Sequence, residues 1–245
     1  MRNLDLIRWL GKRLVGVDTL DGLVQAHLLE ASERDALREA RATLRRDRYA
    51  LHLEAGRAEE RLLFDWQRAL AARLGHAHPD ATGNDAVERF MQEYFRAAGT
   101  TERLLVQLLE RLQEFLQPLP PPRDLDAHFV MRGSRLELRD PDWLSQAPEG
   151  LVEVFVKRFD VAGCTGVTAA TMRAVEHALV EHGSGLSRDP AVLAAFLALL
   201  RRGAGAVRVL EALNRHGVLA AILPPFARVV GRMQYDLFHV YTVDE

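Results

Sequence analysis

The stretch DAVERFMQEYFRAAGTTERLLVQLLERLQEFL, residues 85–116, carries the longest helical pattern of the chain. Its apolar residues recur with the period of about 3.6 residues that places them on one side of an α-helix. Asn84 precedes the stretch and is of a residue type that caps helix N-termini well. Gly99 marks the point at which the helix would bend or divide. An aromatic and leucine stripe of this kind usually packs into a core, so the stretch predicts a long helix inside a helical protein.

Shorter amphipathic patterns lie before this stretch and predict further helices. Three of them cover Leu4–Leu14, Thr19–Leu29 and Glu59–Leu74, and a longer one runs from Ser32 to Gly56. Ser32 is the expected N-cap of the longer one, because acidic residues follow it in the first turn. The spacing of the four patterns predicts helices joined by short turns.

A proline-rich segment follows the long stretch, and the clearest strand signal comes directly after it. Phe129–Arg132 and Arg135–Arg139 are short alternating runs around Gly133-Ser134, which predicts a β-hairpin. The expected fold is therefore all-α, a multi-helix array with one small β-hairpin near residues 129–139. Helix caps are predicted beyond the hairpin at Asp140-Pro141, Thr168 and Asp189-Pro190.

The composition is that of a globular protein with nearly balanced charge. The 245 residues are 48% hydrophobic and carry a formal net charge of −2, which gives no electrostatic case for nucleic acid or an anionic membrane as partner. Cys164 is the single cysteine, so no disulfide can form within the chain and a reducing cytoplasm fits. The longest apolar run, Ala191–Leu200, is too short to cross a bilayer, and no signal peptide follows Met1. We therefore expect a soluble, cytoplasmic protein.

Arginine supplies nearly all the basic residues, and guanidinium groups favour bidentate contacts with carboxylates or phosphates. A coding bias is the simpler explanation of this composition. Arg48 and His52 interrupt an apolar stripe one helical turn apart. In one interpretation they face a neighbouring domain or its ligand phosphates. In the other, Arg48 pairs with a partly buried carboxylate and His52 is a hydrogen-bonded core histidine, which is the default because an unpaired buried charge is costly.

Three patterns resemble catalytic or metal-binding sets without completing one. His76-Ala77-His78 offers two histidines and no third ligand, so a solvated loop is expected. Gly133-Ser134 followed by Asp140-Pro141-Asp142 has the parts of a nucleotidyltransferase site, in which a turn binds triphosphate and two carboxylates hold Mg²⁺. Pro141 would prevent regular strand pairing between the acids, so a helix cap is the preferred interpretation. Asp124-Leu125-Asp126 has no preceding Gly-Ser turn.

The C-terminal stretch MQYDLFHVYTVDE, Met233–Glu245, resembles the entry to the HD phosphohydrolase domain of the bifunctional uridylyltransferase/uridylyl-removing enzymes, which modify the nitrogen-signalling protein PII. Val87–Ala97 and Arg139–Phe155 resemble two further segments of that family. The opening residues MRNLDLIRWLGKR resemble the point just after the family's nucleotidyltransferase domain, with Asn3 in place of an aspartate. Leu44–Arg68 is similar to a run of family landmarks, carried here by Arg48, Leu51-His52, Gly56-Arg57, Arg61-Leu62 and Gln67.

The resemblance implies the helical middle of a larger enzyme that transfers UMP from UTP to a PII tyrosine and removes it by hydrolysis. In that family a histidine, the first metal ligand of the HD site, usually follows the VDE residues, so the chain is expected to stop one residue before a second active site. Mg²⁺ or another divalent metal is implied for the parent enzyme. The implied domains are a helical uridylyltransferase-associated domain truncated at its N-terminus (1–117), a Pro-rich linker (118–126), a second helical region with the hairpin (127–232) and the start of an HD domain (233–245).

No catalytic, cofactor-binding or metal-binding residue is assigned within this chain. Its expected role is an inter-domain scaffold, with the flanking nucleotidyltransferase and HD domains and PII as partners. One alternative is a free-standing helical adaptor that binds PII or a related protein. Another is a small enzyme that uses Gly133, Asp140 and Asp142. The candidate structural or interface residues are Arg48, His52, Arg57, Arg61, His239, Asp244 and Glu245.

Overall fold

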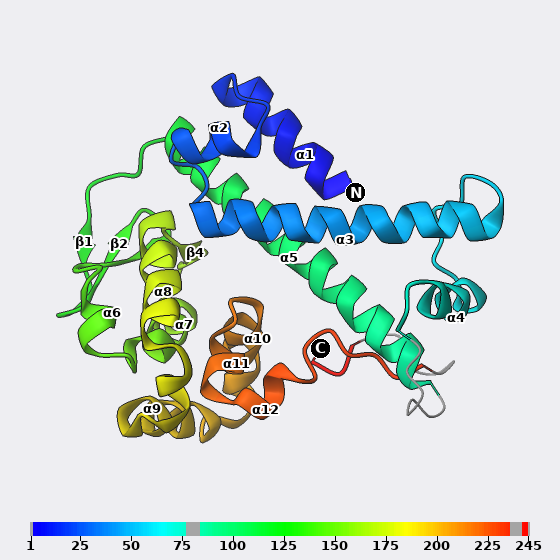
Figure 1. Ribbon diagram of the computed structural model, residues 1–245. Coiled ribbons are helices and arrows are strands. Elements are labelled where there is room, and N and C mark those ends of the chain that lie inside the picture. The colour runs from blue at the N-terminus through cyan, green and yellow to red at the C-terminus, as the bar shows by residue number, and fades with distance from the viewer. Residues whose placement is uncertain (1, 77–83, 236–241, 245) are drawn as a thin grey trace. The chain divides into compact units, whose positions relative to one another are not determined.

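The computed structural model of the chain describes residues 2–76, 84–235 and 242–244. These residues are mostly helical with a small sheet, which confirms the predicted helical array with a β element. The chain forms two compact units: unit 1 comprises residues 1–109 and 229–245, and unit 2 comprises residues 110–228. Figure 1 shows the elements of each unit. Each unit is a group of residues that contact one another closely. The domain boundaries expected from the sequence remain a prediction.

Unit 1 is built from helices. Their bounds are α1 Arg2–Leu10, the π-helical segment η1 Gly11–Val15, α2 Leu20–Gln25, α3 Ala31–Ala55, α4 Phe64–Arg73 and α5 Asp85–Leu116, of which residues 85–109 belong to unit 1. α5 is continuous through Gly99, so this glycine does not divide the helix. Gly56 ends α3 as predicted, with a left-handed φ of 63° that glycine adopts without steric cost.

The start of α3 differs from the prediction of a serine cap. Glu30, and not Ser32, is the N-cap residue, and it forms a reciprocal capping box with Glu33. The backbone N–H of Glu30 donates to Glu33 Oε2 at 2.7 Å. Because each side chain of the box satisfies a backbone N–H that the helix leaves free, the pair fixes the first helical residue at Ala31.

The start of α4 lies later than predicted, at Phe64 rather than Glu59. The carboxylate of Glu59 accounts for the difference. Its Oε1 accepts hydrogen bonds from the backbone N–H groups of Glu60 at 3.0 Å and Arg61 at 2.9 Å. A side chain that binds nearby backbone N–H groups competes with the helix for them, so the chain stays in a turn until Leu63.

The core of unit 1 joins α3, α4 and α5 to the segment after residue 228. Val230 accepts hydrogen bonds through its carbonyl from Gln92 Nε2 at 3.0 Å and Arg96 Nε at 3.1 Å. Tyr235 donates its hydroxyl hydrogen to the carbonyl of Phe64 at 2.7 Å. This segment therefore returns to helices that lie far from it in sequence. The buried members of the core are Ala50, Leu51, Leu70, Ala71, Val87, Phe90, Met91 and Met233.

Unit 2 contains a sheet whose described strands run in the order β1-β2-β3-β4. The strands are β1 Arg123–Asp124, β2 Phe129–Arg132, β3 Arg135–Leu138 and β4 Gly166–Val167. The predicted hairpin is confirmed as β2 antiparallel to β3, with Gly133 in its turn at a φ of 61°. β1 pairs antiparallel with β2, and β4 pairs parallel with β3. Neither pairing was predicted, and β1 lies within the stretch expected to be a linker.

Some helices of unit 2 begin at the N-cap residues that the sequence predicted, and others do not. Their bounds are α6 Trp143–Gln146, α7 Gly150–Asp160, α8 Ala169–His182, η2 Gly183–Arg188, α9 Pro190–Leu200, η3 Gly203–Ala206, α10 Val207–Arg215, α11 Val218–Ile222 and α12 Pro224–Ala227. Thr168 caps α8 and Asp189 caps α9 through their side chains, as predicted. The predicted cap at Asp140-Pro141 is wrong in position, because Asp142 is the N-cap of α6 and its side chain makes no capping hydrogen bond.

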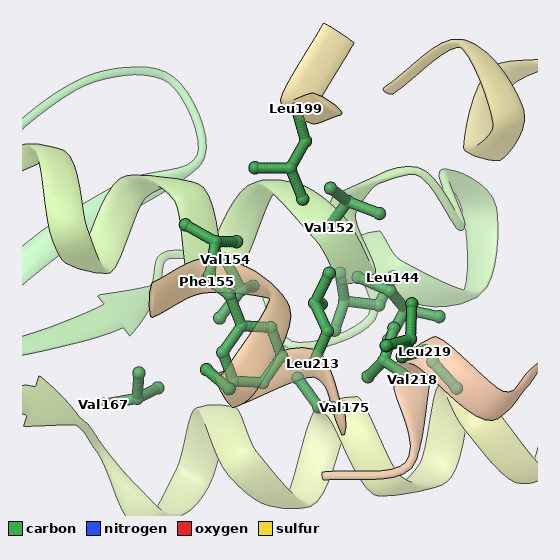
Figure 2. Close-up of a cluster of buried hydrophobic side chains, with 14 of the residues drawn as sticks. Leu144, Val152, Val154, Phe155, Val167, Val175, Leu199, Leu213, Val218 and Leu219 are labelled. Atoms are coloured by element: carbon green, nitrogen blue, oxygen red, sulfur yellow. The ribbon is translucent and has the colours of Figure 1, made fainter. Parts of the chain in front are cut away.

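The core of unit 2 lies where α7, α8, α10 and α11 meet. Phe155 and Val152 of α7, Val175 of α8 and Leu213 of α10 gather there (Figure 2), and each is at most 1% exposed. Leu136 and Leu138 extend this core to the sheet. The buried face of β3 therefore packs on helices, which fixes the register of the hairpin.

Candidate functional site

Arg48 and His52 lie one turn apart on α3, and both point toward Glu60. Glu60 belongs to the connection between α3 and α4, residues 56–63. Arg48 Nε lies 3.0 Å from each carboxylate oxygen of Glu60, and Arg48 Nη2 also contacts Oε1. The hydrogen bond from Arg48 holds the pKa of Glu60 below its ordinary value. His52 Nε2 lies 3.6 Å from Glu60 Oε1, which is too far for a hydrogen bond. Arg48 is thus paired, although its carboxylate is exposed and not partly buried.

Arg57 and Arg61 flank a second carboxylate, that of Glu59. Arg57 Nη2 lies 2.7 Å from Glu59 Oε2, and 71% of the Arg57 side chain is exposed. The backbone hydrogen bond from Arg61 lowers the pKa of Glu59, and the charges of Arg57 and Arg61 add to the effect. The connection is therefore held in shape by two ionised carboxylates, while the guanidinium groups remain at the surface.

Apolar side chains are exposed beside these charges. Tyr49 and Leu53 lie on α3, and Leu63 and Phe64 lie where the connection enters α4; all four are among the exposed large hydrophobic residues. Arginine and tyrosine beside exposed apolar area are typical of protein interfaces. The arrangement is suited to recognition of another protein surface.

Asp244 is held against unit 1 near the C-terminal end of the described residues. Its Oδ1 accepts a hydrogen bond from the backbone N–H of Gly231 at 2.8 Å. Val243 donates its N–H to the carbonyl of Arg232 at 2.7 Å, and Arg232 forms an ion pair with Glu88 of α5. Two further candidates from the sequence, His239 and Glu245, lie outside the described residues.

Asp140 of the nucleotidyltransferase-like pattern and both acids of Asp124-Leu125-Asp126 form contacts within the fold. Asp140 Oδ1 accepts a hydrogen bond from the N–H of Asp142 at 3.0 Å, which shapes the turn before α6. Asp124 pairs with Arg139 at 2.9 Å, and Asp126 pairs with Lys157. Among the residues that the structure describes, no three His, Cys, Asp or Glu side chains form a group that could hold a metal ion.

The sequence pointed to Arg48, Arg57 and Arg61 as candidate residues, but it did not identify their acidic partners. Glu59 and Glu60 decide how Arg48, Arg57 and Arg61 are held. The signal that could have found them is the alternation of opposite charges in RAEER, residues 57–61, directly after the glycine that ends a helix.

Two family models match the chain in succession. A model described as GlnD PII-uridylyltransferase matches residues 1–109, and a model described as uridylyltransferase GlnD third domain matches residues 129–222. No solved structure matches the chain. None of the described helices is long and apolar enough to cross a membrane.

Several curated proteins are similar to the whole chain, and their names agree. The bifunctional uridylyltransferase/uridylyl-removing enzyme of Nitrosococcus oceani is 37% identical over 248 residues, and that of Methylococcus capsulatus is 41% identical over 248 residues. The enzyme of the same name from Thiobacillus denitrificans is 40% identical over 246 residues. Each alignment covers 100% of this chain, which spans 28% of the length of the first two relatives and 29% of the third.

Proposed function

Because the chain belongs to the GlnD uridylyltransferase family, we propose that it is the helical middle region of a bifunctional enzyme. That enzyme transfers UMP from UTP to a tyrosine of PII in the cytoplasm and removes it by hydrolysis. The chain is a scaffold between a nucleotidyltransferase domain and an HD phosphohydrolase domain, and it is not catalytic alone.

The observation that carries this proposal is the order and extent of the matches. The two family models fall on the chain in succession, and relatives align with its full length while it spans under a third of theirs. A segment that makes up under a third of a larger enzyme supports a role in linking its other domains.

The chemistry of the described residues supports a structural role. The carboxylate of Asp140 accepts a hydrogen bond from a backbone N–H group, and those of Asp124 and Asp126 pair with basic side chains. Mg²⁺ or another divalent metal, which such an enzyme requires for both reactions, would be held by the flanking domains. The connection between α3 and α4 is the surface that we assign to contact with a flanking domain or with PII.

The test is a comparison of the purified 245-residue chain with a longer protein that contains it. Each is incubated with UTP, Mg²⁺ and PII, and the mass of PII is followed. The longer protein is expected to add one uridylyl group to PII, and the chain alone is expected to add none. Transfer by the chain alone would overturn the scaffold role.

A second arm tests the alternative of a free-standing adaptor. Binding of PII to the purified chain is measured by calorimetry, with and without UTP. Tight binding by the chain, together with no effect of the chain's surface variants on the longer protein's turnover, would favour the adaptor over the scaffold.

A further inference from the structure

A hollow on the surface of unit 2 lies between the loop before β2 and one face of α7. Its volume is about 290 Å³, which is just below the range of about 300–1,000 Å³ that is usual for pockets of drug-sized ligands. The hollow therefore suits a single side chain better than a whole cofactor. Its lining includes Asp126, His128, Phe129, Glu153, Val156 and Lys157.

The wall from α7 is formed by three side chains on one face of the helix. Glu153, Val156 and Lys157 are spaced by three and four residues, which makes them neighbours on the helix surface. Lys157 Nζ forms an ion pair with Asp126 of the loop. It also lies 5.9 Å from the centroid of the Phe129 ring. These contacts hold the two walls of the hollow together.

The opposite wall is a loop whose shape is fixed by hydrogen bonds. Asp126 Oδ1 accepts hydrogen bonds from the N–H groups of His128 at 3.0 Å and Phe129 at 2.9 Å. The His128 ring stacks on Trp143, with 4.1 Å between the ring centroids and 12° between the planes. Because His128 is exposed and lines the hollow, the ring face that Trp143 does not cover is available to a ligand.

The charges that line the hollow do not balance. Asp126 and Glu153 each bring a carboxylate, and Lys157 brings the single ammonium group. Lys157 is already paired with Asp126. The side chain of Glu153 has no hydrogen-bond or ion-pair partner among the residues that the structure describes. The hollow therefore presents one unmatched carboxylate beside an exposed aromatic face, which favours a cationic ligand.

We propose that this hollow binds an arginine side chain that a partner protein presents. A guanidinium group forms two parallel hydrogen bonds with a carboxylate such as that of Glu153, and it stacks on aromatic faces such as that of His128. The aliphatic stem of an arginine can pack against Val156. A lysine would offer only a point charge and could not stack. Arginine is also enriched among the anchor residues of protein interfaces.

The hollow lies in unit 2, whereas the connection that we assign to contact with a flanking domain or PII lies in unit 1. Binding of arginine in the hollow does not depend on the scaffold role. Failure of either one would leave the other standing.

The experiment follows the backbone amide chemical shifts of the isotope-labelled 245-residue chain during titration with Nα-acetyl-arginine amide. Saturable shifts are expected at residues 126–129 and 153–157, and no shifts are expected in α1. Nα-acetyl-citrulline amide has nearly the same shape without the charge, and it should produce no saturable shifts. Absence of saturable shifts with the arginine probe, or equal binding of the citrulline probe, would overturn the site.

Glu153→Gln is expected to weaken binding of the arginine probe roughly tenfold, because it removes the charge-assisted contact. The matched control is Glu211→Gln, which removes the same charge from an exposed position of α10 in unit 2 and should bind as the unaltered chain does. Equal weakening by the two variants would show a diffuse attraction and overturn the site.

A second variant is needed because Glu153 also lies in the first turn of α7, where a carboxylate stabilises the helix. His128→Ala leaves α7 unaltered and is expected to weaken binding roughly threefold through the loss of stacking. Binding that both Glu153→Gln and His128→Ala leave unchanged would overturn the site. Free arginine should bind no more tightly than the blocked amide. Tenfold tighter binding of free arginine would identify a small-molecule site and overturn the assignment to a protein side chain.

Discussion

Arg48 of α3 and Glu60 of the following connection form an ion pair in which Arg48 Nε lies 3.0 Å from both carboxylate oxygens. The pair ties the last turns of α3 to the chain beyond Gly56. Together with the contacts of Glu59, it gives a defined shape to a connection that has no helix or strand of its own. A surface loop with a defined shape is pre-organised for recognition, because little entropy is lost when it binds.

The first prediction concerns this connection as an interface. Replacement of Arg57 and Arg61 by alanine in a longer protein that contains the chain is expected to slow UMP transfer to PII by roughly tenfold, the cost of losing an interface anchor. The melting temperature should change little, because both arginines are exposed and an exposed ion pair such as Arg57–Glu59 contributes little to stability. The readout is the initial rate of the mass increase of PII.

The control for this prediction is Arg201→Ala, an exposed arginine just after α9 in unit 2. It should leave the rate unchanged. Equal rates for the interface variant and the unaltered protein would remove the connection from the proposed contact surface.

The second prediction concerns close packing at Gly150, the first residue of α7. A Cβ at this position would lie 2.6 Å from Leu144 Cδ2 and 2.8 Å from Trp143 Cζ3. Gly150→Ala is therefore expected to destabilise the chain by about 1–3 kcal/mol, the usual cost of an overpacked core. Urea unfolding followed by circular dichroism measures the change.

Gly99→Ala is the matched control, because Gly99 is also helical and a Cβ there would have no neighbour within 4 Å. Alanine at an open helix position should stabilise the chain by roughly 0.5–1 kcal/mol. Opposite signs for the two substitutions are the expected outcome. Stabilisation by Gly150→Ala would contradict the packing around α6 and α7.

The third prediction concerns the core of unit 2. Phe155 of α7 is 0% exposed, and Phe159 on the same helix is 39% exposed. Phe155→Ala should destabilise unit 2 by about 3–5 kcal/mol, because the change removes buried apolar surface and leaves a cavity. Phe159→Ala should cost far less. Similar unfolding midpoints for the two variants would show that α7 is not packed as in Figure 2.

The fourth prediction concerns pH and Asp47, which is 3% exposed on α3. Burial raises the pKa of Asp47 above its ordinary value, and the neighbouring Arg46 offsets part of this effect. A carboxyl with a raised folded-state pKa stabilises the fold most below its unfolded pKa of about 3.9 and loses this contribution as pH rises through the folded value.

The measurement compares the free energy of unfolding of the unaltered chain and of Asp47→Asn across this pH range. Because asparagine does not titrate, the difference between the two proteins reports Asp47. The stability of the unaltered chain relative to the variant should fall as pH rises from about 4 toward neutrality, by about 1.4 kcal/mol for each unit of pKa shift. If the relative stability rises over this range, burial is not the dominant effect on the pKa of Asp47.

Local signals in the sequence predicted local structure well. Thr168 and Asp189 cap helices as expected, because a cap depends on a side chain and amides within three residues. The hairpin at Gly133 was found for the same reason. Ser32 is not the cap because the helix already begins at Ala31, where Glu30 and Glu33 form a reciprocal capping box.

Structure that depends on distant partners was missed. β4 is two residues long and pairs with β3 about thirty residues earlier in the chain, so no periodic pattern could mark it. Val230 binds Gln92 and Arg96 through its carbonyl, and a backbone acceptor leaves no trace in the sequence. In the candidate site, the helical spacing of Arg48 and His52 predicted that both lie on one face of α3. Their contact with Glu60 could not be predicted, because it depends on the path of the connection after Gly56.

The most direct test of the scaffold role is amide hydrogen exchange of residues 56–63, compared between the isolated chain and a longer protein that contains it. If the connection between α3 and α4 contacts a flanking domain, its amides exchange more slowly in the longer protein, while those of α7 in unit 2 are unchanged. Equal exchange of residues 56–63 in the two proteins, with PII present and absent, would contradict the account.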